Sequence, residues 1–119
     1  SQVIVTTTPS ATPLIRASWV QPGTHITAIG ADTPTKQELE GALLARADLV
    51  VSDSLTQAST RGEVFRAVTS GDVQLCDVVE LGSILLGQHP GRTSPTDITI
   101  ADLTGVAVQD LAIASAIAL

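Results

Sequence analysis

Short aliphatic runs alternate with segments of helical periodicity along this chain, and no other feature limits its possible folds as strongly. Strands are predicted at residues 3–5, 25–29, 49–51 and 98–101, and helices at 35–48, 60–70, 78–86 and 106–119. Strands that alternate with helices in this order form parallel βαβ units. The sequence therefore predicts an α/β fold with one parallel sheet and helices on both faces.

The composition agrees with a buried parallel sheet. Hydrophobic residues make up 44% of the 119 residues, but Tyr and Met are absent and the large aromatic side chains are limited to Trp19 and Phe65. Val, Ile, Leu and Ala must then build the core, as they do in parallel sheets covered by helices. A chain of this length fits one domain.

Two of the predicted helices begin with a capping-box pattern, in which a Thr is followed three residues later by a Glu. The pairs are Thr35 with Glu38 and Thr60 with Glu63. In such a box each side chain accepts a bond from the other residue's backbone amide. The apolar side chains that recur at helical spacing in the first of these segments are Leu39, Leu43, Leu44 and Ala47. We expect this stripe to face the core.

The charge and the cysteine content exclude several kinds of partner. The net charge is −6 and the pI is near 4.5, whereas nucleic acids and acidic lipid surfaces require clustered Lys and Arg. No apolar run approaches the roughly 20 residues that span a bilayer. The single Cys76 can form neither a disulfide nor a thiolate zinc site within the chain. We therefore expect no nucleic-acid partner, no membrane and a reduced, cytoplasmic compartment.

Two further patterns do not predict a site. His25 and His89 have no third ligand at a workable spacing, so no metal is expected. His25 also lies in a predicted strand, where a hydrogen-bonded structural histidine is typical. The segment 87–94 is similar to a phosphate loop, but its glycine spacing is one residue short, Arg92 replaces the Lys, and it precedes a strand. A phosphate loop follows a strand.

Three polar segments follow predicted strands, at residues 6–10, 30–36 and 102–105. In open α/β sheets ligands bind outside the carboxyl ends of the strands, so these segments can converge on one crevice. Asp32, in the second segment, is the leading catalytic candidate. A short acid before Thr-Pro is also typical of a helix cap or an Asx turn, and that alternative stays open.

Four motifs are spread along the chain: VTTTPS at 5–10, PGTHITAIGADTPTKQEL at 22–39, GRTSPTDITI at 91–100 and TGVAVQD at 104–110. Together they resemble the ornithine cyclodeaminase/mu-crystallin family. The resemblance implies that residues 1–119 form the second half of an NAD(P)-binding Rossmann domain. It also implies an enzyme that handles α-amino or α-imino acids by hydride transfer, as in ornithine cyclodeamination, alanine dehydrogenation and cyclic ketimine reduction.

The same resemblance assigns roles to single residues. Asp32 matches the catalytic acid/base of the family, and Thr104 a position beside the substrate. The residues that match contacts to NAD or NADP are Thr8, Ile29, Gly30, Ala31, Lys36 and Leu103. Two of the positions depart from the family pattern. Thr35 stands where Gly is usual, and Leu103 stands where a Ser commonly bonds the cofactor, which removes a hydrogen bond.

The chain also lacks parts that the family has. Neither G-x-G-x-x-G nor G-x-G-x-x-A occurs, and no residue is identified that would distinguish NAD from NADP. We therefore expect a piece of a longer protein, with the apolar segment 106–119 as an exit helix toward a substrate and dimerisation domain, and a homodimer. Two alternatives remain, namely a non-catalytic mu-crystallin-like ligand-binding protein and an inactive structural fragment.

Overall fold

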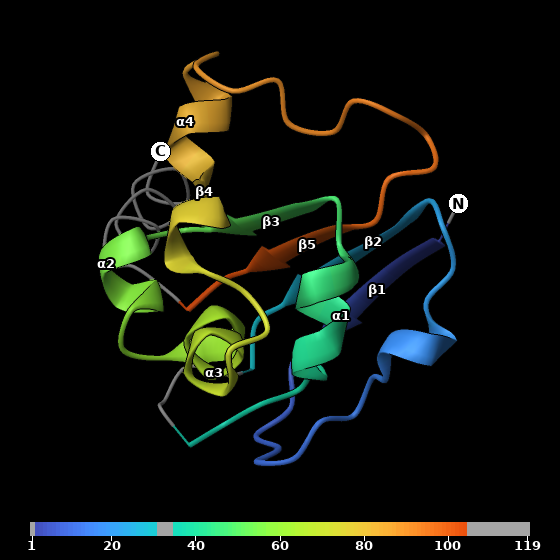
Figure 1. Cartoon of the computed structure of the whole chain (residues 1–119), viewed down its shortest axis with the longest axis vertical. Helices are drawn as coiled ribbons and strands as arrows, with labels where there is room; N and C mark the ends of the chain where they lie inside the picture. Colours follow the sequence, from blue (N-terminus) through green and yellow to red (C-terminus); the bar gives the residue numbers. More distant parts are fainter. Residues whose placement is uncertain (1, 31–34, 105–119) are drawn as a thin grey trace, which may run out of the picture.

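The computed structural model describes residues 2–30 and 35–104 and contains one sheet of five parallel strands (Figure 1). The strands are β1 (Gln2–Thr6), β2 (Thr24–Ala28), β3 (Leu49–Ser52), β4 (Val79–Glu80) and β5 (Thr99–Asp102), in the order β1-β2-β5-β3-β4. The helices are α1 (Gly41–Arg46), α2 (Leu55–Ala58), α3 (Gly62–Ser70) and α4 (Leu81–Leu85), with 3-10 turns at Ala17–Trp19 and Leu75–Asp77. The predicted parallel α/β sheet is confirmed.

The last residues of the strands lie in one row across the sheet. Thr6 is in register with Ala28, Ala28 with Asp102, Asp102 with Ser52, and Ser52 with Glu80. The final strand along the chain, β5, lies between β2 and β3. The segments that follow β1, β2 and β5 therefore leave the sheet at one edge, as the pattern of polar strand ends predicts.

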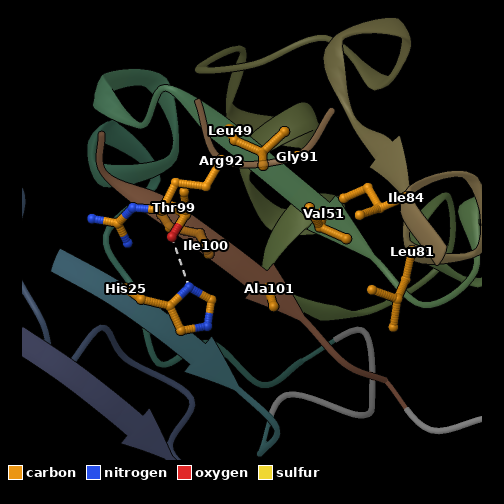
Figure 2. Close-up of a pocket in the computed structure, with 10 residues that line it drawn as sticks. All are labelled: His25, Leu49, Val51, Leu81, Ile84, Gly91, Arg92, Thr99, Ile100 and Ala101. Carbon is orange, nitrogen blue, oxygen red and sulfur yellow. Dashed lines mark hydrogen bonds between the residues drawn. The ribbon is translucent and has the colours of Figure 1, made fainter. Parts of the chain in front are cut away.

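One face of the sheet carries the core. Ile26, Val50 and Ile100 point toward α1 and α3, where Leu43 and Val64 are among the fully buried side chains. The alternate residues point to the other face and line a groove of about 350 Å³ (Figure 2). Helix α4 borders this groove with Leu81 and Ile84. Helices thus lie on both sides of the sheet, as predicted.

The predicted helix at 35–48 is shorter in the structure, because α1 begins only at Gly41. The backbone amides of Glu38 and Leu39 donate to the Glu63 carboxylate instead of to a helix partner, and Leu39 pairs with Ile15 in an isolated parallel bridge. The capping box of Thr35 and Glu38 is therefore wrong. The buried stripe is right for Leu39, Leu43 and Leu44.

The second capping box is also wrong. Helix α3 begins at Gly62 with Arg61 as its N-cap, and the Glu63 side chain is buried rather than turned back to the cap. The predicted end at Gly71 is correct, because this residue caps the helix at φ +84°. The segment 78–86 divides into β4 and α4, so a strand was missed there. The predicted helix at 106–119 lies outside the described residues.

Candidate functional site

The loops after β1 and β2 form a pocket at the carboxyl edge of the sheet. The pocket has a volume of about 270 Å³ and is lined by Thr7, Thr8, Pro9, Ile29, Gly30 and Lys36. The two loops are joined at their bases, because the Ile29 amide donates to the Thr6 carbonyl at 2.9 Å. Four of the predicted cofactor residues, Thr8, Ile29, Gly30 and Lys36, thus lie around one cavity. Ala31 and the catalytic candidate Asp32 lie outside the described residues.

The absence of a side chain at residue 30 is what allows the two loops to meet. A Cβ at Gly30 would overlap the carbonyl oxygen of Thr8 and lie 2.6 Å from the Thr8 nitrogen. It would also lie 2.8 Å from Cδ of Glu38. Backbone and carboxylate surround this point, so no flexible group can move aside, and only Gly fits.

The Glu38 carboxylate holds the same two loops together from within. Its Oε2 accepts bonds from the Thr8 amide at 2.6 Å and the Thr8 hydroxyl at 2.8 Å, and its Oε1 accepts from the Gly30 amide at 2.9 Å. The side chain is fully buried. Buried carboxylates are tolerated when hydrogen bonds replace the lost water, and these three donors supply that replacement.

A second buried carboxylate, that of Glu63, holds the backbone of Glu38 in place. Glu63 accepts from the Glu38 amide at 2.8 Å with each of its oxygens, and from the Leu39 amide at 2.7 Å. Burial raises the pKa of Glu63 to about 7, and the nearby Asp102 and Glu38 add to the rise, while the two backbone amides oppose it. The group is therefore partly protonated near neutral pH.

The third buried carboxylate, Asp102, ends β5 and accepts from the Val64 amide of α3 at 3.0 Å. Its Oδ1 has no hydrogen-bond partner among the described residues. Burial raises its pKa to about 6. The sequence predicts a polar segment at 102–105 that includes Asp102, but it does not predict that the carboxylates of Glu38, Glu63 and Asp102 are buried. Glu38 and Glu63 matched a capping pattern, and the only available signal was an acid beside aliphatic residues.

The predicted residues Leu103 and Thr104 follow β5 and do not line the 270 Å³ pocket. The Leu103 amide donates to the carbonyl of Ala28, at the end of β2, at 2.9 Å. The Thr104 hydroxyl is buried and lies 3.1 Å from Asp53 Oδ1 and 2.8 Å from Gln57 Oε1. These two residues thus lie on the same edge of the sheet, with Thr104 directed toward α2.

His25 is a hydrogen-bonded histidine, as predicted. Its side chain lines the groove on the face of the sheet that is opposite to α1 and α3. Its Nδ1 lies 2.7 Å from the Thr99 hydroxyl (Figure 2) and its Nε2 lies 2.9 Å from the Thr27 hydroxyl. Burial, assisted by Arg92, lowers its pKa. Arg92 itself donates to the carbonyls of Gly23 and Pro95. Within residues 2–30 and 35–104 no cluster of metal-ligating side chains occurs, and no helix is long and apolar enough to cross a membrane.

The buried acids predict a pH dependence of stability. The pKa of Glu63 rises from 4.5 to about 7 on folding, so its stabilising contribution is complete below pH 4.5 and is lost as the pH rises through about 7. From pH 5 to pH 8 we expect a loss on the order of 3 kcal/mol in the free energy of unfolding. Asp102 adds a loss in the same direction, because its pKa is raised from 3.8 to about 6, and this loss is complete above about pH 6.

Urea denaturation at several pH values measures this loss. The Glu63→Gln variant, whose amide imitates the protonated acid, should lose most of the Glu63 part of the slope. Glu40→Gln is the matched control, because the Glu40 carboxylate accepts from Ala17 outside the buried cluster. A wild-type stability that increases from pH 5 to pH 8 would mean that these acids are charged in the folded protein.

The comparisons with known proteins place the chain in one family. A sequence model of the ornithine cyclodeaminase/mu-crystallin family matches residues 1–118. Alanine dehydrogenase from Archaeoglobus fulgidus is 48% identical over 116 residues, which are 97% of this chain and 36% of that protein. The ketimine reductase mu-crystallin of Mus musculus is 32% identical over 111 residues, which are 93% of this chain and 33% of that protein.

Solved structures show the same relation. An archaeal alanine dehydrogenase dimer with bound NAD has a TM-score of 0.89 and 48% identity over 95% of this chain and 35% of its own. The iminosuccinate reductase of Paracoccus denitrificans, in complex with NAD+, has a TM-score of 0.88 and 44% identity over 96% of this chain and 35% of its own. The chain thus spans about a third of the length of these relatives, and its sheet is a partial Rossmann-type fold.

Proposed function

The chain belongs to the ornithine cyclodeaminase/mu-crystallin family, and we propose that it forms the nicotinamide side of the site in an NAD(P)-dependent enzyme of amino-acid metabolism. The substrate would be a small α-amino or α-imino acid. The observation that carries the proposal is the pocket between the β1 and β2 loops, where Thr8, Ile29, Gly30 and Lys36 lie together. Relatives crystallised with NAD support it.

The residues around the pocket fit a nicotinamide ring and its amide. Ile29 is 43% exposed and offers an apolar surface. Gly30 lets the two loops that line the pocket meet, because a Cβ there would overlap Thr8. The Thr8 hydroxyl donates its proton to Glu38, so toward a ligand it can act only as an acceptor. The carboxamide NH2 of nicotinamide is a donor, and the two are complementary.

When bound, NAD or NADP would supply the hydride acceptor or donor. The protein has to move a proton, and we assign this to the carboxyl group of Asp32, which would exchange it with the substrate nitrogen or with an attacking water. Thr104 would lie beside the substrate. The Thr104 hydroxyl has one proton, so it can donate to only one of the two oxygens that it faces, those of Asp53 and Gln57. When the side-chain amide of Gln57 is turned round, its NH2 group donates to the Thr104 hydroxyl and both contacts are satisfied.

The test uses the natural full-length protein. L-alanine is offered with NAD+ and with NADP+, and a cyclic ketimine acid with NADH and with NADPH, while absorbance at the wavelength of the reduced nicotinamide is followed. L-ornithine is offered with NAD+ and with NADP+ while ammonia release is followed, because cyclodeamination returns the hydride to the product and leaves no reduced dinucleotide. We expect turnover of at least one amino or imino acid and a preference for one of the two dinucleotides. A protein that binds neither dinucleotide would contradict the proposal. The homodimer, the exit helix at 106–119 and the cytoplasmic location remain predictions.

A second function is favoured by Leu103, namely a non-catalytic protein that binds a ligand in the same place. Leu103 replaces a Ser that bonds the cofactor in the resembled family, so affinity for the dinucleotide should be reduced. Leu103→Ser should increase that affinity by about 0.5–1.5 kcal/mol, which is the net value of one recovered hydrogen bond.

Calorimetric titration with NADH and NADPH measures the effect, and Leu103→Ala separates the new hydroxyl from the simple loss of the leucine. An affinity that is unchanged in Leu103→Ser, or equally increased in Leu103→Ala, would show that the residue 103 hydroxyl does not reach the cofactor. Binding of a dinucleotide without turnover of any amino or imino acid would favour the non-catalytic alternative. An inactive fragment would neither bind a dinucleotide nor turn over an amino or imino acid.

A further inference from the structure

Glu38 uses every polar group it has to hold other segments of the chain. Its side chain accepts from Thr8 and Gly30 at 2.6–2.9 Å. Its own amide donates to Glu63 at 2.8 Å. Its carbonyl accepts from the amides of Leu14 at 2.7 Å and Ile15 at 3.1 Å. One buried residue thus joins the loop after β1, the loop after β2, the segment at 14–15 and the start of α3.

The chemistry of these contacts requires a carboxylate and not merely a polar side chain. All three groups that face the Glu38 side chain are donors: two backbone amides and one hydroxyl. Glutamine has the same shape but carries one oxygen and one NH2 group. Whichever way its amide is turned, the NH2 group meets an N–H of Thr8 or of Gly30. The orientation that keeps the two bonds to Thr8 gives up the bond to Gly30.

The contacts also determine the shape of the pocket. Thr8 and Gly30 both line the 270 Å³ cavity, and Glu38 bonds both from the interior. Without its carboxylate the two loops would still be tied by the Ile29 to Thr6 bond at their bases. The position of the Thr8 and Gly30 segments above that base therefore depends on Glu38.

We propose that Glu38 is a positioning residue that sets the separation of the Thr8 and Gly30 loops and so preforms the pocket for the nicotinamide end of the cofactor. The proposal rests on the proposed function for the identity of the ligand. Glu38 acts through these two loops and does not itself touch the reacting atoms. Glu63, which bonds the Glu38 amide, holds it in place.

The test compares Glu38→Gln with Glu40→Gln in the natural full-length protein. Glu40 is a matched control, because it lies two residues away and its carboxylate accepts from Ala17 at 3.2 Å, away from both loops. For Glu38→Gln we expect the Kd of the reduced cofactor to rise about 10- to 100-fold, from the loss of one charge-assisted hydrogen bond. The KM of the amino or imino acid, measured at saturating cofactor, should change much less. Glu40→Gln should behave as the wild type does.

Amide NMR spectra of the same proteins provide a readout that does not depend on cofactor. The Gly30 amide resonance should move in Glu38→Gln and stay in place in Glu40→Gln. If Gly30 moves but cofactor affinity does not change, the contact is structural only and the positioning role is wrong, while the proposed function stands. If Gly30 does not move, the contact with Glu38 is wrong. A wild-type protein that binds no dinucleotide refutes the proposed function, and with it the role of Glu38 toward that ligand.

Hydrogen exchange in the wild type keeps the proposal testable if Glu38→Gln does not fold. A preformed pocket requires that the Thr8 and Gly30 amides exchange slowly without cofactor, at rates like those of β2. Amides that exchange at the rate of an open loop, and become slow only when NADH is added, would show that the cofactor and not Glu38 orders the two loops.

Discussion

We expect the replacement of Asp32 with asparagine to lower kcat by about 10²- to 10⁴-fold in the natural full-length protein, which is the usual contribution of a positioned proton-transfer group. Asparagine keeps the size of the side chain but cannot take up or release the proton. Folding and dinucleotide binding should therefore be unchanged. Steady-state kinetics with the preferred amino or imino acid measures the loss, and titration with NADH or NADPH verifies that binding is retained.

A matched control for this variant is Asp97→Asn. Asp97 lies in the loop before β5, where it accepts bonds from Thr93 and Ser94. That position is at the amino end of the strand, away from the site, so kcat should be unchanged. Near-normal turnover of Asp32→Asn would refute the catalytic role and favour the alternative of a helix cap or an Asx turn.

Gly30→Ala should abolish measurable dinucleotide binding and destabilise the protein by about 1–3 kcal/mol or more, as overpacking does. The new methyl group would overlap the Thr8 carbonyl and press on the Thr8 nitrogen and on Glu38. The loops after β1 and β2 would have to separate, and the pocket between them would be lost. Thermal unfolding and cofactor titration measure the two effects.

Gly82→Ala is the control for this substitution. Gly82 lies in α4, and among the described residues no atom beyond its chain neighbours and the backbone of its own helix lies within 4 Å of where its Cβ would be. Alanine there should be neutral or stabilising by up to about 1 kcal/mol, because Ala favours helices over Gly. If Gly30→Ala binds cofactor as the wild type does, the two loops are not held as closely in solution as in the structure.

Four of the five strands could be predicted from the sequence because their signal is local, whereas the two-residue β4 was missed. Val3, Ile26, Val50 and Ile100 belong to short β-branched runs bounded by polar residues, and each run lies in a strand. The helix beginnings could not be predicted in the same way. The Thr-x-x-Glu pattern describes a local bond, but Glu38 and Glu63 form bonds across 25 to 30 residues of sequence. Tertiary contacts replaced the local pattern in both cases.

In the candidate site, too, one part could be predicted from the sequence and another part could not. That the residues after β1 and β2 meet follows from the parallel sheet, so Thr8 and Gly30 could be placed on one edge before the structure was known. The group that joins them could not be predicted, because the sequence does not distinguish a buried carboxylate that accepts from three donors from an acid on the surface. Thr104 was expected near the same crevice, but it is directed toward Asp53 and Gln57 of the neighbouring loop and helix.

The central claim is that the loops after β1 and β2 receive the nicotinamide end of NAD or NADP. Methyl NMR of the natural protein with labelled Ile29 tests it directly, because Ile29 lines the pocket and its side chain is 43% exposed. We expect a saturable shift of the Ile29 methyl resonance on addition of the preferred dinucleotide, with a nuclear Overhauser effect to a nicotinamide ring proton. Saturable dinucleotide binding that leaves the Ile29 methyl unchanged would contradict it.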